Sequence, residues 1–181
     1  MSIAPDYAEP ISGWRAWLVA EREGDVRLRS LFFPAFWPAR HELVAECLCR
    51  RLLPLPKRFR ASRHTAPARR CECGVYATDL RNAVEYFKHA RSFQEDLVVR
   101  VLGRVSLWGS VVECERGWRA ARAYPSALFL PSRSLGGRPL ERLERIAFGL
   151  ADYGVPVHIV DAGKPDELMA RLAASGPPLA A

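Results

Sequence analysis

The sequence predicts an α+β fold in which a small, bent β-barrel or half-barrel carries an inserted loop and helix and is followed by a helix–strand–helix cap. Three observations favour this class. Residues 12–33 and 97–131 alternate apolar and polar side chains, as strands require. Residues 79–97 repeat apolar side chains at helical spacing, and after residue 138 helical and strand patterns alternate. Because 49% of the 181 residues are hydrophobic, the chain can bury a core without covalent staples.

The chain is expected to open with a hairpin. Apolar side chains fall at every second position in SGWRAWLVA (12–20) and again in VRLRSLFF (26–33), which is the spacing of strands. Gly24 and Asp25 lie between these segments and form a dipeptide typical of hairpin turns. The proline-bearing loop PAFWPAR follows and contains Trp37, and HELVAECLCR then fits a short strand or a helical turn.

Three helices are predicted. The first covers 79–97 and begins with Asp79, a residue type preferred at helix N-caps. The second covers 139–154, has an amphipathic pattern and ends at Gly154. The third covers 164–174 and carries a proline near its start and acidic residues in its first turn, where they favour helix formation.

The other strands are expected at residues 97–107, 110–114, 118–130 and 155–161, with a hairpin turn at ERG (115–117). Gly103 and Gly109 are expected to mark bends where the barrel closes or another backbone comes near. The strand pattern around these two glycines looks like that of small barrels that bind nucleic acid, including PUA-like ones.

The cysteines point to a metal rather than to disulfides. There are five, at positions 47, 49, 71, 73 and 114. An odd number in a chain without a secretory signal favours metal ligation or simple burial. Cys71 and Cys73 could bind one ion if the backbone turns sharply after them, which Gly74 permits, and His64 lies seven residues before the pair. Cys114 is alone in a predicted strand and is expected to lie in the core.

We predict that Cys47, His64, Cys71 and Cys73 bind a structural zinc ion, because such sites use four Cys or His ligands in a tetrahedron. Four protein ligands leave no position for a reactive water molecule. Cys49 is the competing ligand: it could replace Cys47, or replace His64 in a set of two Cys-x-Cys pairs. The predicted domains are a flexible tail (1–11), a β-rich zinc-binding domain (12–134) and a helix–strand–helix extension packed on it (135–181).

The excess positive charge of the chain, +7 in total, is concentrated in residues 50–70, which contain eight basic residues and no acidic one. They are Arg50, Arg51, Lys57, Arg58, Arg60, Arg63, Arg69 and Arg70. Such a cluster attracts polyanions, nucleic acid first, although it equally suits a solvated loop beside zinc thiolates. Trp17 and Trp37 are candidates for exposed aromatic residues that stack on bases or anchor a protein interface, the alternative being that they fill a small barrel.

These features favour a cytoplasmic module that binds DNA or RNA through its basic loop and exposed aromatic residues. The alternative is a protein-interaction subunit or adaptor of a larger bacterial complex, in which the arginines meet an acidic partner. No phosphate-binding glycine loop, nucleophile elbow or metal-hydrolase helix supports an enzyme, and no catalytic residue is assigned. No apolar run of about 18 residues indicates a membrane span, and the N-terminus lacks the pattern of a secretory signal.

Three segments together resemble a family of actinobacterial and phage proteins: AEC (45–47), HTAPARRCECGVYA (64–77) and VLGRVSLWGSVVE (101–113). That family also begins with a GWR-W strand and ends in a YGVPV segment, here 153–157, so the resemblance covers most of residues 12–157. The resemblance implies that Cys47, His64, Cys71 and Cys73 belong together. It implies no activity.

Overall fold

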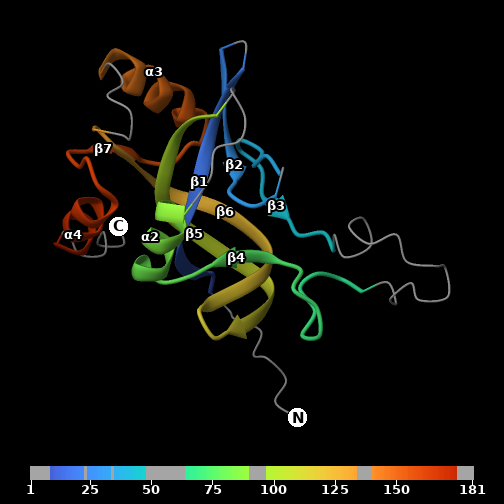
Figure 1. Cartoon of the computed structure of the whole chain (residues 1–181). Coiled ribbons are helices and arrows are strands. Elements are labelled where there is room, and N and C mark those ends of the chain that lie inside the picture. The colour runs from blue at the N-terminus through green and yellow to red at the C-terminus, as the bar shows by residue number, and fades with distance from the viewer. Residues whose placement is uncertain are drawn as a thin grey trace.

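The computed structural model describes residues 9–22, 24–33, 35–47, 64–89, 97–133 and 140–174 (Figure 1). These residues form a mixed α+β fold with a seven-stranded sheet and three α-helices. The α+β class is therefore confirmed. The sheet of the described residues is open, so its strands do not form a closed, continuously hydrogen-bonded barrel. The likeness to PUA-like barrels stays a prediction.

Four strands form the centre of the sheet in the order β2-β1-β5-β6, each antiparallel to its neighbour. They are β1 (Ile11–Arg22), β2 (Asp25–Ser30), β5 (Leu97–Cys114) and β6 (Gly117–Pro131). The opening hairpin and the turn after Cys114 are confirmed. The prediction of two separate strands at 97–107 and 110–114 is wrong, because β5 continues through this region as one long strand.

The β5–β6 ladder is irregular close to both glycines at which bends were predicted, and at Gly103 the predicted close approach of another backbone is confirmed. The ladder shifts register between Arg104 and Val105 and again between Trp108 and Val111. A Cβ atom at Gly103 would overlap the carbonyl oxygen of Ala127, so no larger residue fits there without moving the backbone. Such irregularities increase the local twist of a ribbon, which lets the sheet curl.

Three short strands pair with β6 along the edge that faces away from β5. They are β4 (Val75–Ala77) and β3 (Leu43–Val44), both antiparallel to β6, and β7 (Val157–Val160), which is parallel to it. Just beyond β4, Thr78 forms an isolated bridge with Trp14 of β1: each backbone nitrogen donates to the other's carbonyl, at 2.7 and 2.9 Å. The sheet therefore curls until its opposite sides touch at one point without closing.

The helices cover both faces of the sheet. Helices α2 (Leu80–His89) and α4 (Pro165–Ala174) lie side by side and pack on one face, around Ala16 and Leu102 (Figure 1). Helix α3 (Leu140–Leu150) packs on the other face and continues into the 3₁₀ turn η2 (Ala151–Tyr153). None of the helices in these described segments is long and apolar enough to span a membrane.

The predicted helix ends agree with the observed caps. The backbone nitrogen of Asn82 donates to the Asp79 carboxylate at 2.7 Å, which confirms Asp79 as the residue that caps α2. Gly154 ends the second helical segment with a φ of 67°, in the left-handed region that glycine adopts without strain. Residues 90–96, which the first predicted helix also included, lie outside the described residues.

Trp17 and Trp37 are fully buried, so the prediction that they are exposed is wrong. Their rings meet edge to face at a centroid distance of 5.3 Å in the core between the sheet and α3. Trp37 donates from Nε1 to Ser30 Oγ at 3.1 Å, and its carbonyl accepts from the Tyr153 hydroxyl at 2.7 Å. The physical reason is the curl of the sheet, whose concave face needs large side chains to fill it.

Candidate metal centre

Four side chains form a compact cluster of metal-ligating atoms. The candidate ligand atoms of Cys47, His64, Cys71 and Cys73 all lie within 4.8 Å of one another. Cys47 Sγ is 3.8 Å from Cys71 Sγ, and His64 Nε2 is 3.3 Å from Cys73 Sγ. Thiolate and imidazole ligands around a tetrahedral zinc ion are about 3.3–3.8 Å apart, given bond lengths of about 2.0–2.3 Å. The prediction that these residues come together is confirmed, and the cluster could hold a metal ion.

Strand β6 positions the cysteines from both sides. Beyond β3, the Ala45 nitrogen donates to the Ala121 carbonyl of β6 at 2.8 Å, which fixes the chain two residues before Cys47. On the other side, β4 begins two residues after Cys73 and pairs with β6. Both arms of the cluster are thus anchored to one rigid strand, although they are far apart in the sequence.

A tight turn presents the Cys-x-Cys pair. The backbone nitrogen of Cys71 donates to the Ala68 carbonyl at 3.0 Å. After Cys73 the chain reverses at Gly74, whose φ of 127° is in a region that residues with a Cβ atom rarely adopt. A Cβ atom at this position would also lie 2.9 Å from Arg119 Cβ. The predicted need for glycine after the pair is therefore confirmed on two grounds.

Arg119 supports this turn through hydrogen bonds, and it was not among the residues predicted for the site. The residue lies in β6 and is only 7% exposed. Its Nη1 donates to the carbonyl of Cys71 and, at 2.9 Å, to that of Cys73, while its Nε lies 3.2 Å from Cys114 Sγ. Among 24 arginines, no signal in the sequence marks this one, because its contacts come from residues 71–73, which are distant in the sequence.

Electrostatics favour a cation in the cluster. Burial raises the pKa of the Cys73 thiol above its usual value, and the neighbouring thiols of Cys71 and Cys47 raise it further. Burial on its own lowers the pKa of Arg119, but contact with Cys114 and the proximity of Tyr76 and Cys73 outweigh it, so the net shift is upward. Thiols packed this closely do not readily ionise together, because their negative charges repel one another. A divalent metal ion would offset this repulsion.

Only some of the other predicted site residues lie in the described part of the chain. Arg69 and Arg70 are exposed immediately before Cys71. The remaining basic residues of the window and the competing ligand lie outside the described residues: Arg50, Arg51, Lys57, Arg58, Arg60, Arg63 and Cys49. Cys114 is half-buried beside Arg119 rather than enclosed in the core, which corrects the prediction for that residue.

No family model, no curated protein and no solved structure matches this chain. The family resemblance drawn from its motifs stays a prediction.

Proposed function

We propose that the chain is a zinc-stabilised module that binds nucleic acid, with Cys47, His64, Cys71 and Cys73 holding a structural zinc ion. The observation that carries this proposal is the place of the cluster along the chain. Cys47 and His64 contribute neighbouring ligand atoms, and they flank residues 48–63, which contain six basic residues and no acidic one. One metal ion would therefore join both ends of the most basic segment.

Closing the segment at its base matters for binding. Fixing the ends of a loop removes part of the conformational entropy that the loop would otherwise lose when it contacts a partner. Arg69 and Arg70 are exposed next to the cluster and add positive charge on the same side of the site. The guanidinium group donates hydrogen bonds in a fork that fits phosphate oxygens, so an arginine-rich loop suits a phosphate backbone.

The burial of Trp17 and Trp37 restricts the ways in which the protein could bind nucleic acid. Because neither ring is accessible, base stacking on them contributes nothing, and affinity would come mainly from phosphate contacts. Such binding depends weakly on nucleotide sequence and strongly on salt. The alternative is an adaptor whose arginines meet an acidic protein partner, and the test below separates the two.

The test is a salt titration of binding to a labelled single-stranded RNA and a DNA duplex, measured by fluorescence anisotropy. Changing Arg58, Arg60 and Arg63 to Gln should lower the log–log salt slope by about two to three, because each phosphate contact contributes about 0.7–0.9. Zinc content should stay at about one equivalent in this variant.

A matched control changes three arginines that lie elsewhere and pair with acidic residues. Arg122, Arg133 and Arg142 form ion pairs with Glu42, Asp161 and Glu21, respectively. Their replacement by Gln removes the same charge and should leave the salt slope nearly unchanged. If the wild-type protein has no affinity for either nucleic acid at low salt, the proposal fails and an acidic protein partner becomes the better explanation.

A further inference from the structure

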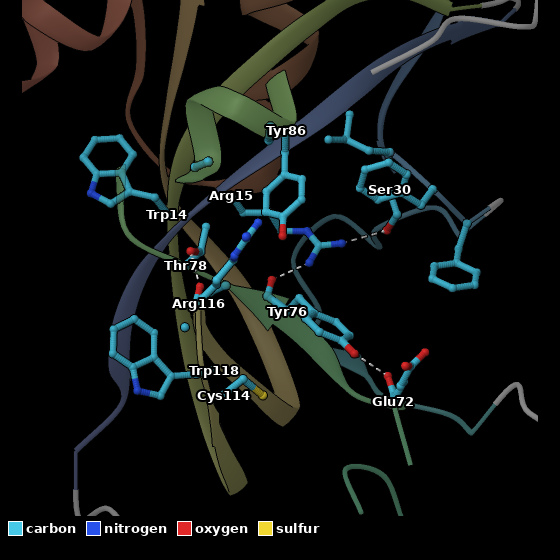
Figure 2. Close-up of a pocket in the computed structure, with 17 residues that line it drawn as sticks. Trp14, Arg15, Ser30, Glu72, Tyr76, Thr78, Tyr86, Cys114, Arg116 and Trp118 are labelled. Atoms are coloured by element: carbon cyan, nitrogen blue, oxygen red, sulfur yellow. Dashed lines mark hydrogen bonds between the residues drawn. The ribbon is translucent and has the colours of Figure 1, made fainter. Parts of the chain in front are cut away.

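A second candidate site lies beside the metal cluster, in a pocket of about 340 Å³ (Figure 2). Its lining includes Phe32 after β2, Tyr76 of β4 and Tyr86 of α2, together with residues of β1 and β6. Figure 2 shows the indole rings of Trp14 and Trp118 turned away from Arg15. The volume is within the range of small-molecule sites, about 300–1,000 Å³. Five separate elements converge here, so the pocket exists only in the folded chain.

The pairing of β1 explains why the pocket forms. Strand β1 pairs with β2 from Trp17 onward and meets the β4 side through the bridge at Trp14. Arg15 and Ala16 lie between these two contacts, on a stretch of strand edge that neither partner covers. Both residues line the pocket, which occupies the gap between the end of β2 and the end of β4.

Arg15 lies in this gap as a cation without a counter-ion. Its Nη1 donates to the Tyr76 carbonyl and its Nη2 donates to Ser30 Oγ at 3.3 Å, and Figure 2 shows the side chain reaching toward these two groups. Its Nε is buried and has no hydrogen-bond partner within the described segments, where no carboxylate forms an ion pair with it either. Burial lowers the pKa of Arg15 to about 10.

Arg15 is half-buried, and its guanidinium lies 5.1 Å from the centroid of the Trp37 ring, which partly stabilises the charge. The buried Nε without a partner remains costly, and a bound anion would offset that cost. Two other charged residues line the pocket, Arg116 and Glu72, so its net charge with Arg15 is positive. Glu72 is exposed and disfavours an anionic group near its own side of the pocket. The favoured place for a negative charge is therefore beside Arg15.

We propose that this pocket binds a small aryl anion, in which a carboxylate or phosphate pairs with Arg15 and the ring system packs between the aromatic side chains. The proposal is independent of the zinc ion and of nucleic-acid binding. It assigns two separable roles to the pocket: Arg15 selects the charge, and the aromatic wall, with Tyr86 at its accessible rim, binds the ring.

The probes are 1-naphthoate, 1-naphthyl phosphate, the neutral 1-naphthamide and inorganic phosphate, titrated into the full chain by calorimetry. Both aryl anions should bind, and comparison of the two distinguishes a carboxylate from a phosphate ligand. Naphthamide should bind about tenfold or more weakly, because it lacks the charge-assisted hydrogen bonds. Equal affinity for naphthoate and naphthamide would overturn the role of Arg15, and equal affinity for naphthoate and inorganic phosphate would overturn the role of the aromatic wall.

Two variants and a control test the residues. Arg15→Gln should weaken naphthoate binding about tenfold and leave naphthamide binding unchanged, whereas Arg122→Gln, a surface arginine paired with Glu42, should change neither. A folded Arg15→Gln protein that binds naphthoate like the wild type contradicts the proposal. Tyr86 is 39% exposed, so the Tyr86→Ala variant should stay folded, and it should weaken the binding of naphthoate and of naphthamide by the same factor. If Arg15→Gln does not fold, unchanged affinity in Tyr86→Ala overturns the proposal instead.

Discussion

Two arginines of the same sheet, Arg119 and Arg15, contact Tyr76 in different ways. Arg119 lies 5.9 Å from the Tyr76 ring and donates to the carbonyls of the Cys71–Cys73 turn. Arg15 donates from Nη1 to the Tyr76 carbonyl and from Nη2 to Ser30 Oγ at 3.3 Å, and its guanidinium lies 5.1 Å from the centroid of the Trp37 ring. Its Nε has no partner among the described residues. Both guanidinium groups contact the fold, but only that of Arg15 lines a pocket and keeps a buried nitrogen without a partner among the described residues.

The difference teaches how to tell a structural cation from a candidate binding group. A buried charge that donates to several backbone carbonyls stabilises them, and removing it leaves those carbonyls unsatisfied. A charge that keeps a buried donor without a partner offsets part of what its other contacts contribute to the fold, so that donor suggests a ligand. Three predictions follow from this contrast, in order of decreasing effect.

The largest effect is expected in the metal cluster that Arg119 supports. Cys71→Ser or Cys73→Ser should lose the metal and much of the folded structure, because structural zinc contributes about 10–16 kcal/mol of apparent binding free energy in small zinc domains. Zinc content by elemental analysis and thermal unfolding by circular dichroism would measure this.

Two comparisons sharpen that experiment. Cys114→Ser should retain the metal, since its sulfur contacts Arg119 and lies outside the ligand cluster. Cys47→Ser should lose the metal; if Cys49→Ser loses it instead, the ligand set contains the competing cysteine. A metal-free wild-type protein that is fully folded would refute the zinc proposal.

Removal of Arg119 should have the second largest effect. Arg119→Met leaves the carbonyls of Cys71 and Cys73 without this donor, and we expect a loss of about 3 kcal/mol in the free energy of unfolding. Zinc affinity, measured by competition with a chelator, should fall about 10–100-fold because the turn that presents two ligands loses its support. Arg122→Gln is the matched control on the same strand and should cost less than about 1 kcal/mol.

The smallest effect is expected at Arg15. Arg15→Met should leave the free energy of unfolding within about 1 kcal/mol of the wild type, because the lost contacts are offset by removing an unpaired cation. Urea unfolding of the zinc-loaded protein would measure both this variant and Arg119→Met under the same conditions. Equal destabilisation by the two changes would break the comparison and make Arg15 a structural residue.

Local patterns in the sequence were sufficient for several features of the fold. Asp79 and Gly154 mark helix ends because capping depends on a few adjacent residues. The alternation of apolar and polar residues in 12–20 and 26–33 predicted the opening hairpin, because this pattern too depends only on residues that are close in the sequence. The four candidate ligands were also predictable, because Cys and His at close spacing have few other roles in a chain of this type.

The sequence by itself thus determined the fold class, most of the elements and the favoured cluster of Cys47, His64, Cys71 and Cys73, whereas tertiary structure decided what each buried side chain meets. Alternation along a strand is consistent with an inward Trp17, but it does not say how far the sheet curls or that Arg119 is covered by a distant turn. That curl buries Trp17 against Trp37, brings Arg119 under the Cys71–Cys73 turn, and opens a gap around Arg15. The reason is physical: the sequence could mark local irregularities at Gly103 and Gly109, but the total curvature depends on how the register shifts add up over the long β5–β6 ribbon.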